Sequence, residues 1–273
     1  MHCRAPAPLS LIMLSNKLRS ALGATLVAAR VYRSLVRNTG VVVAFHRVTD
    51  TLPEDGITRG ARAFEQFCQF FRANFQVVTL GDFVARLERR DPVGGMLAIT
   101  FDDGYLDNFE IAAPVLERLS LPATFFVATR LIDSKAIPWW DAKLPKAPAW
   151  MTWQHVRELS RAGFDIGAHT QTHVDLGTVS GGAAEADIEG SRRDLLEQLG
   201  REPRHFAFPY GGRANLLEEN RRRVMAAGFR CCVSCHGGIV VGEADPFQLP
   251  RVPISPWYRT ANQFGFEVVA RRA

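Results

Sequence analysis

The chain has 273 residues, of which 47% are hydrophobic and 22% charged, as in an ordinary globular protein. This length fits one large domain, such as an α/β barrel, or two small ones, and five cysteines are too few for a disulfide framework. The net charge is +5, but the basic residues are scattered and no nucleic-acid-binding motif accompanies them, so we expect no nucleic-acid partner.

The first 38 residues differ from the rest and are predicted to form an N-terminal helical extension. The apolar run 9–14 is short and is followed by Lys17 and Arg19, so it is not a clean signal peptide. Residues 18–36 have apolar side chains near helical spacing with arginines between them. This pattern fits a helix packed on the domain, which we favour slightly, or a peripheral contact with a membrane surface. A cytoplasmic or inner-membrane-surface location is favoured.

From residue 39 to 273 strand-like and helix-like segments alternate. The predicted strands are 41–48, 76–80, 96–101, 123–128, 164–168, 204–208, 229–234 and 247–254. The predicted helices are 64–75, 81–90, 107–119, 153–162, 183–199 and 216–227. Such alternation is typical of parallel strands joined by helices. We therefore predict an α/β fold, a distorted (β/α) barrel with about seven parallel strands.

Two segments fall outside this pattern. The long loop 130–151 contains Trp139, Trp140 and Trp150, which could stack on sugar rings or cap the barrel, with nothing in the sequence to choose between these. Cys231, Cys232 and Cys235 form a group like a metal-binding motif, but no second pair of ligands accompanies it. We interpret these cysteines as strand residues with incidental thiols.

Unusual polar clusters lie at the ends of four of the predicted strands. They are His46, the pair Asp102 and Asp103, the pair His169 and His173, and the segment Phe208-Pro209-Tyr210-Gly211. The carboxyl ends of parallel barrel strands open onto one face, where active sites form, so these residues are expected to converge. Each motif alone is weak: two histidines four residues apart are often surface residues, and Asp-Asp-Gly is usually a turn.

Their residue types suggest metal-assisted hydrolysis. Two imidazoles, predicted to share a helical turn at His169 and His173, and one carboxylate make a three-ligand site that resembles catalytic zinc centres. A metal in such a site lowers the pKa of bound water. Of the adjacent carboxylates, Asp103 would bind the metal, and Asp102 would stay free to accept a proton as general base.

These motifs resemble those of the polysaccharide deacetylase family, the NodB-homology domain. The resemblance rests on Thr100–Gly104, His169–His173 and Pro209–Gly211, in this order. It implies a catalytic domain over 39–273 that removes acetyl groups from an acetylated glycan, most commonly with Zn²⁺, although Co²⁺, Ni²⁺ or Mn²⁺ would fit. It further implies that the backbone N–H of Tyr210 contributes to an oxyanion hole and that Phe208 and Pro209 shape the substrate groove. From the tryptophan-rich loop, we also expect Trp140 to contact substrate.

The C-terminal histidine that usually supplies the general acid is missing from the segment Leu249–Pro253. In the exopolysaccharide-deacetylase-like subgroup that this chain resembles, an N-terminal histidine takes its place. His46 lies at the end of the first predicted strand, so we expect His46 to protonate the leaving amine. Arg251 is expected to pair with Asp102 and keep it ionised, or to be a surface arginine.

Two other functions remain as alternatives. One is a catalytically inactive carbohydrate-binding protein on the same fold, which would normally have lost Asp102 or a metal ligand. The other is a glycosidase that uses Asp102 and Asp103 as an acid–base pair, although adjacent residues rarely span the ~5 Å or more that such a pair requires.

Overall fold

The barrel is built on β1 (Thr39–Phe45), an apolar, β-branched run that is buried along its whole length. The computed structural model describes residues 14–271, and there β1 pairs in parallel with β5 (Met96–Phe101). The sheet continues in parallel through β6 (Thr124–Val127), β7 (Asp165–Ala168), β8 (His205–Ala207) and β9 (Cys231–Ser234). A helix connects each of these strands to the next, which confirms the predicted βαβ organisation.

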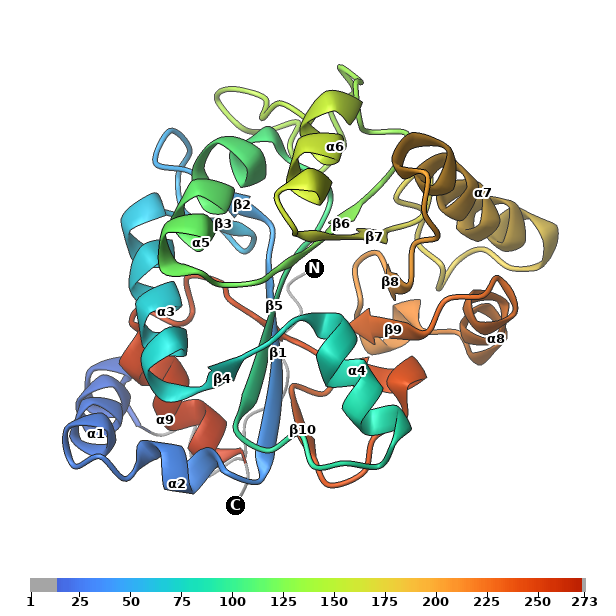
Figure 1. Cartoon of the computed structure of the whole chain (residues 1–273). Coiled ribbons are helices and arrows are strands. Elements are labelled where there is room, and N and C mark those ends of the chain that lie inside the picture. The colour runs from blue at the N-terminus through green and yellow to red at the C-terminus, as the bar shows by residue number, and fades with distance from the viewer. Residues whose placement is uncertain (1–13, 272–273) are drawn as a thin grey trace.

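Two very short strands complete the barrel. β11 (Leu249–Pro250) pairs in parallel with β9, and β12 (Val252–Pro253) pairs in parallel with β1. Arg251 lies between them, so one short segment bridges the last long strand and the first. The result is a nearly closed barrel of mostly parallel strands, as predicted (Figure 1).

Helices surround the barrel, and shorter strands lie at its edges (Figure 1). The helices between the strands are α3 (Ala61–Asn74), α4 (Leu80–Glu88), α5 (Ala113–Leu119), α6 (Trp153–Arg161), α7 (Gly181–Leu199) and α8 (Glu218–Ala226). The remaining short elements are β2 (Arg47–Val48), β3 (Thr58–Arg59), β4 (Gln76–Val77), β10 (Ile239–Val241), a π-helix at Asn108–Ala112 and 3₁₀ turns at Arg213–Asn215 and Pro246–Gln248. The predicted helix 107–119 therefore begins with π geometry, and Pro114 lies in the first turn of α5, where a missing N–H costs nothing.

The alternation of side chains along β5 decides which of them face the site. Leu97, Ile99 and Phe101 belong to the outer core beneath the helices, where Phe101 stacks on Phe45 and Phe125. Ala98 belongs to a second, inner core with residues of α4, and Thr100 donates to the Val43 carbonyl. Because side chains on a strand alternate with a period of two, the residue after β5 on this inner face is Asp102.

One expectation for the fold needs correction, and two elements were not predicted. The predicted strand 247–254 is a 3₁₀ turn followed by β11 and β12, because two prolines interrupt its hydrogen bonding. The antiparallel β10, which extends β1 on its edge, was not expected. Neither was the last helix, α9 (Ala261–Ala270).

The N-terminal extension forms α1 (Asn16–Ala28) and α2 (Tyr32–Val36), which lie against α9 (Figure 1). A buried ion pair of 3.0 Å between Arg19 of α1 and Glu267 of α9 joins the two ends of the chain. The predicted domain boundary at residue 38 coincides with the start of β1, and as a division into domains it stays a prediction. Within 14–271 no helix has both the length and the apolar character needed to cross a bilayer.

Candidate active site

Three side chains with metal-binding atoms converge at the carboxyl ends of β5 and β7. The Oδ1 atom of Asp103 lies 3.3 Å from Nε2 of His169 and 3.2 Å from Nε2 of His173. All three side chains are buried, and one ligand atom from each lies within 4.8 Å of the others. The structure thus brings together the three residues expected to bind metal.

The two histidines do not lie on a helical turn, and that expectation was wrong. Residues 169–173 form a loop in which Thr170 and His173 have positive φ values of 61° and 57°. The loop is held by Asp187 of α7, whose Oδ1 accepts hydrogen bonds from the backbone N–H groups of Gln171 and Thr172. Left-handed backbone at two positions therefore aims both rings at Asp103, as the four-residue spacing would have done on a helix.

The hydrogen bonds of this group fit a divalent metal. Nδ1 of His169 donates to the Ala207 carbonyl at 2.8 Å, which leaves Nε2 as the lone-pair atom facing Asp103. Oδ1 of Asp103 is buried and accepts no conventional hydrogen bond. Burial would raise the pKa of Asp103, but His169 and His173 hold it well below the usual range. A buried carboxylate and two imidazoles therefore form a set that a cation would satisfy.

Asp102 faces the barrel interior and is clamped by Arg251. The guanidinium donates from Nη1 to Oδ1 at 2.7 Å and from Nη2 to Oδ2 at 2.6 Å, and both residues are buried. Burial would raise the pKa of Asp102, but Arg251 outweighs it, and the pKa is lowered. The predicted pairing is confirmed, because Arg251 lies between β11 and β12 where the barrel closes.

His46 follows β1 and points to the same carboxylate. Its Nε2 lies 3.8 Å from Oδ2 of Asp102, and the side chain remains partly exposed. Burial lowers the pKa of His46 more than Asp103 and Asp102 raise it. The structure therefore places the expected acid beside the expected base, just beyond direct hydrogen-bond distance.

Below His46, the side chains of Asp107 and Asn108 hold its backbone. Nδ2 of Asn108 donates to the His46 carbonyl at 2.6 Å and to Oδ1 of Asp107 at 2.7 Å, and the Val48 N–H donates to the same Oδ1. Burial raises the pKa of Asp107 to about 7 despite these donors. Neither residue was singled out in the sequence, where both read as the start of a helix.

Because the pKa of Asp107 is higher in the folded than in the unfolded chain, its protonation stabilises the fold at acid pH. That stabilisation is present below about pH 4 and is lost as the pH rises through about 7. We expect Asp107→Asn to raise the free energy of unfolding by on the order of 2 kcal/mol at about pH 8, and to change it little at about pH 4. Urea denaturation at both pH values measures this; an equal effect at both would contradict it.

Aromatic side chains border the metal-ligand group. The Trp140 ring lies 4.6 Å from the His173 ring, and Tyr210, which has a φ of 61°, lies 4.9 Å from it. Trp139 is largely exposed, and its Nε1 donates to the Tyr210 hydroxyl. Trp150 is buried and stacks on Tyr105 at 4.5 Å. The three tryptophans of the loop thus divide between the site rim and the hydrophobic packing beneath it.

A buried polar network, which the sequence reasoning missed, holds Trp140 in place. Nε1 of Trp140 donates to the Tyr105 hydroxyl at 2.9 Å, and that hydroxyl donates to Oδ2 of Asp141 at 2.8 Å. Oδ1 of Asp141 pairs with the buried guanidinium of Arg47, which also binds Asp55 at 2.7 Å. The only sequence signal was the position of Arg47, directly after His46; the loop residue Asp141 gave none.

Two residues that were expected to contact substrate, Phe208 and Pro209, are buried behind the site. Phe208 is buried in the outer core and packs on Phe206 at 5.3 Å, and Pro209 is buried. The structure therefore does not bring Phe208 to the open side of the site. Two of the three cysteines are strand residues as expected: Cys231 and Cys232 are buried in β9, burial raises the pKa of both thiols, and Sγ of Cys232 donates to the Phe247 carbonyl. Cys235 is buried too, but it lies just beyond β9, so the strand interpretation was wrong for it.

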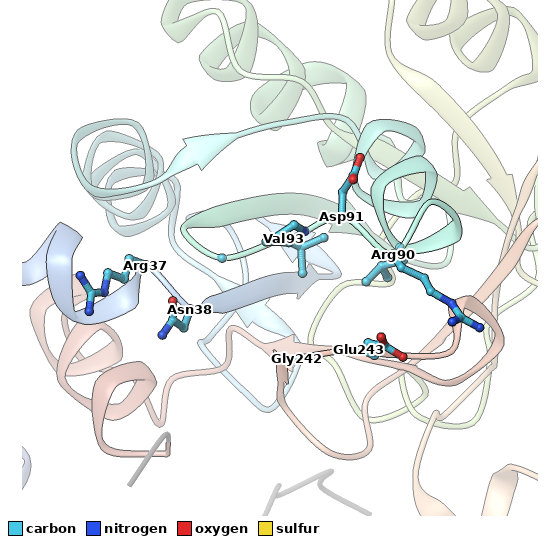
Figure 2. A pocket seen from close by; sticks show the side chains of 10 residues that line it. Arg37, Asn38, Arg90, Asp91, Val93, Gly242 and Glu243 are labelled. Atoms are coloured by element: carbon cyan, nitrogen blue, oxygen red, sulfur yellow. The ribbon is translucent and has the colours of Figure 1, made fainter.

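A separate cavity of about 280 Å³ opens at the other end of the barrel (Figure 2). It lies beside the amino ends of β1 and β5 and is bordered by Arg37, Arg90, Asp91 and Glu243. The catalytic candidates follow the carboxyl ends of the same strands. This cavity is therefore distinct from the candidate active site.

The sequence profile described as polysaccharide deacetylase matches residues 89–230. That match covers Asp102, Asp103, His169, His173 and Tyr210. The chain belongs to the polysaccharide deacetylase family. This confirms the predicted resemblance and the predicted enzyme class, because the family consists of hydrolases.

Individual relatives agree with this assignment. The poly-β-1,6-N-acetyl-D-glucosamine N-deacetylase of Staphylococcus epidermidis is 23% identical over 246 residues, 80% of each chain. YxkH of Bacillus subtilis is 25% identical over 167 residues, which is 61% of this chain but only 54% of that protein.

Solved structures share the fold. The Streptococcus pyogenes deacetylase PplD, solved in complex with acetate, matches with a TM-score of 0.71 at 18% identity over 83% of this chain and 96% of that one. IcaB from Ammonifex degensii matches with a TM-score of 0.68 at 23% identity over 85% and 97%.

Proposed function

We propose that this protein removes acetyl groups from N-acetylated sugars of a polysaccharide or a lipid-linked glycan. One observation carries the proposal: the Asp103–His169–His173 group lies beside a second carboxylate, Asp102, which is withheld from it by Arg251. Metal ligation and proton transfer thus have separate residues. The similarity to an exopolysaccharide N-deacetylase supports an N-acetyl rather than an O-acetyl substrate.

Asp103, His169 and His173 would hold a divalent metal, of which Zn²⁺ suits the two imidazoles best and Co²⁺, Ni²⁺ or Mn²⁺ also fit. Bound there, the metal would polarise the acetyl carbonyl and lower the pKa of a water molecule. Asp102, kept ionised by Arg251, would accept the proton of that water. The backbone N–H of Tyr210 would donate to the oxyanion that develops on the carbonyl.

His46 would deliver a proton to the departing amine. Its Nε2 and Oδ2 of Asp102 are 3.8 Å apart, so a proton accepted by the carboxylate can reach the imidazole in one short transfer. A lowered pKa makes the protonated ring a stronger donor. Trp140, fixed against His173, would form one wall for the sugar ring, with Trp139 and Tyr210 beside it.

Acetate release from partly acetylated glucosamine oligomers, measured together with the metal content of the same preparation, tests the proposal. We expect release that a chelator abolishes and that added Zn²⁺ restores, and a melting temperature that rises with metal because the ligand set exists only in the folded chain. Metal binding without acetate release would instead support the inactive sugar-binding alternative.

The appearance of new reducing ends would indicate the glycosidase alternative. The structure gives no support to that reading, because Asp102 is bound on both oxygens by Arg251 and Asp103 faces two histidines. The two carboxyl groups therefore do not flank a space in which a glycosidic bond could lie between them.

A further inference from the structure

The net positive charge of the chain comes from its N-terminal residues. Residues 1–49 contain seven Arg and Lys side chains and no Asp or Glu, while the whole chain has 33 basic and 28 acidic side chains. Residues 50–273 therefore hold 26 basic and all 28 acidic side chains. An asymmetry of this kind points to an anionic partner at the N-terminal end.

In α1 the apolar side chains divide between two faces: Leu26 and Val27 pack against the core, and Leu18 and Leu22 lie on the opposite side. The inner face of α1 also carries Arg19, which is paired with Glu267, and Gly23. A Cβ atom at Gly23 would lie only 1.9 Å from the carbonyl oxygen of Asn262 in α9. This close contact fixes which face of α1 points inward.

The opposite face of α1 is apolar and points to solvent. We call it the outer stripe, and it consists of Leu18, Ala21, Leu22, Thr25, Ala28 and Ala29. Leu18 and Leu22 are 45% and 38% exposed. The one hydroxyl of the stripe, on Thr25, donates to the Ala21 carbonyl and so is satisfied within the helix.

Two larger exposed apolar side chains lie near α1. Val31, just beyond α1, is 43% exposed, and Trp257 is 39% exposed and lies beside α1, with the Arg19 guanidinium 5.3 Å from its ring. Exposed basic residues border this surface: Lys17 precedes the stripe, Arg30 follows it, and Arg259 is two residues from Trp257. Apolar side chains, a tryptophan and a basic border together are the composition of helices that lie in a membrane interface.

We infer that the outer stripe, with Val31 and Trp257, docks onto the surface of an anionic lipid bilayer. A bilayer surface offers both an acyl boundary for the leucines and headgroup phosphates for Lys17 and Arg30. The alternative occupant is a second copy of this chain. A dimer through the outer stripe would bring the basic border of one copy against that of the other, and like-charge repulsion opposes this. No described helix can span a membrane, so α1, which lies on the outer side of α9 in Figure 1, would lie along the interface.

Vesicle flotation with the full chain tests the inference. We expect binding to vesicles of phosphatidylcholine mixed with phosphatidylglycerol, weakened by salt, and little binding to phosphatidylcholine alone. Leu18→Gln with Leu22→Gln should lower the partition coefficient by about tenfold or more, and so should Lys17→Gln with Arg30→Gln. Acetate release from soluble oligomers should be unchanged in both, which shows that these variants fold.

The matched control replaces Leu217 and Met225 with Gln, because these side chains are 37% and 45% exposed at α8, away from the stripe. It should bind vesicles like the parent. The inference is overturned if the Leu18/Leu22 variant binds as well as the parent or if the control loses as much binding. It is equally overturned if the parent ignores anionic vesicles and light scattering shows a dimer that the Leu18/Leu22 change dissociates.

Discussion

Replacing His46 with alanine is expected to lower the rate of acetate release by about a hundredfold to ten-thousandfold, while the bound metal stays at the parent level. The ring is the proposed proton donor to the leaving amine and lies 3.8 Å from Asp102, but it is not one of the three convergent metal-binding residues. Steady-state kinetics and metal analysis on the same preparation measure the two effects separately. The loss should appear in kcat rather than in KM.

The matched control is His236→Ala. His236 is the last histidine of the chain and is exposed in the segment after β9, whereas the usual family arrangement takes its acid from the C-terminal region. We expect this variant to retain parent activity. The assignment of the acid to His46 fails if His46→Ala is fully active, or if the two variants lose activity equally.

Replacing Arg251 with methionine should have the largest effect on stability, a loss of about 3–5 kcal/mol in the free energy of unfolding. The change leaves the carboxylate of Asp102 buried without the two hydrogen bonds that now satisfy it. Urea denaturation measures the loss. A loss below about 1 kcal/mol would show that the pair is not the buried unit described here.

A double variant, Arg251→Met with Asp102→Asn, separates stability from catalysis. It removes both charges, so most of the lost stability should return, because a missing pair is far less costly than one unpaired buried charge. Activity should not return, since no base remains. Arg230→Met provides the control: its ion pair with Glu88 is partly exposed, and we expect its loss to cost less than about 1 kcal/mol.

The fold was readable from local patterns because its main strands are short, buried and separated by amphipathic helices. The predicted strand 96–101 coincides with β5, and the helix predicted at 153–162 coincides with α6 to within one residue. Both have strong signals: a continuous apolar run in one, and helical periodicity ended by Gly163 in the other. β10 was missed because three residues in a glycine-rich segment become a strand only by pairing with β1.

The site was predictable for a different reason. Residues that follow parallel strands must meet at one end of a barrel, so the sequence by itself determined that Asp102, Asp103, His169 and His173 would converge. The wrong helical turn at His169–His173 did not affect this result, since ring direction depends on the loop backbone and on its hydrogen bonds to Asp187.

Contacts between distant segments were decided only by the tertiary structure. Arg251 reaches Asp102 because β11 and β12 close the barrel, and Arg47 meets Asp141 because the loop 130–151 folds back over Tyr105. The burial of Arg19 against Glu267 likewise joins α1 to α9, and Leu18 and Leu22 of α1 stay outside. Residue type and spacing determine which strands and helices form, but such polar pairings depend on where those elements pack, and no local pattern encodes that.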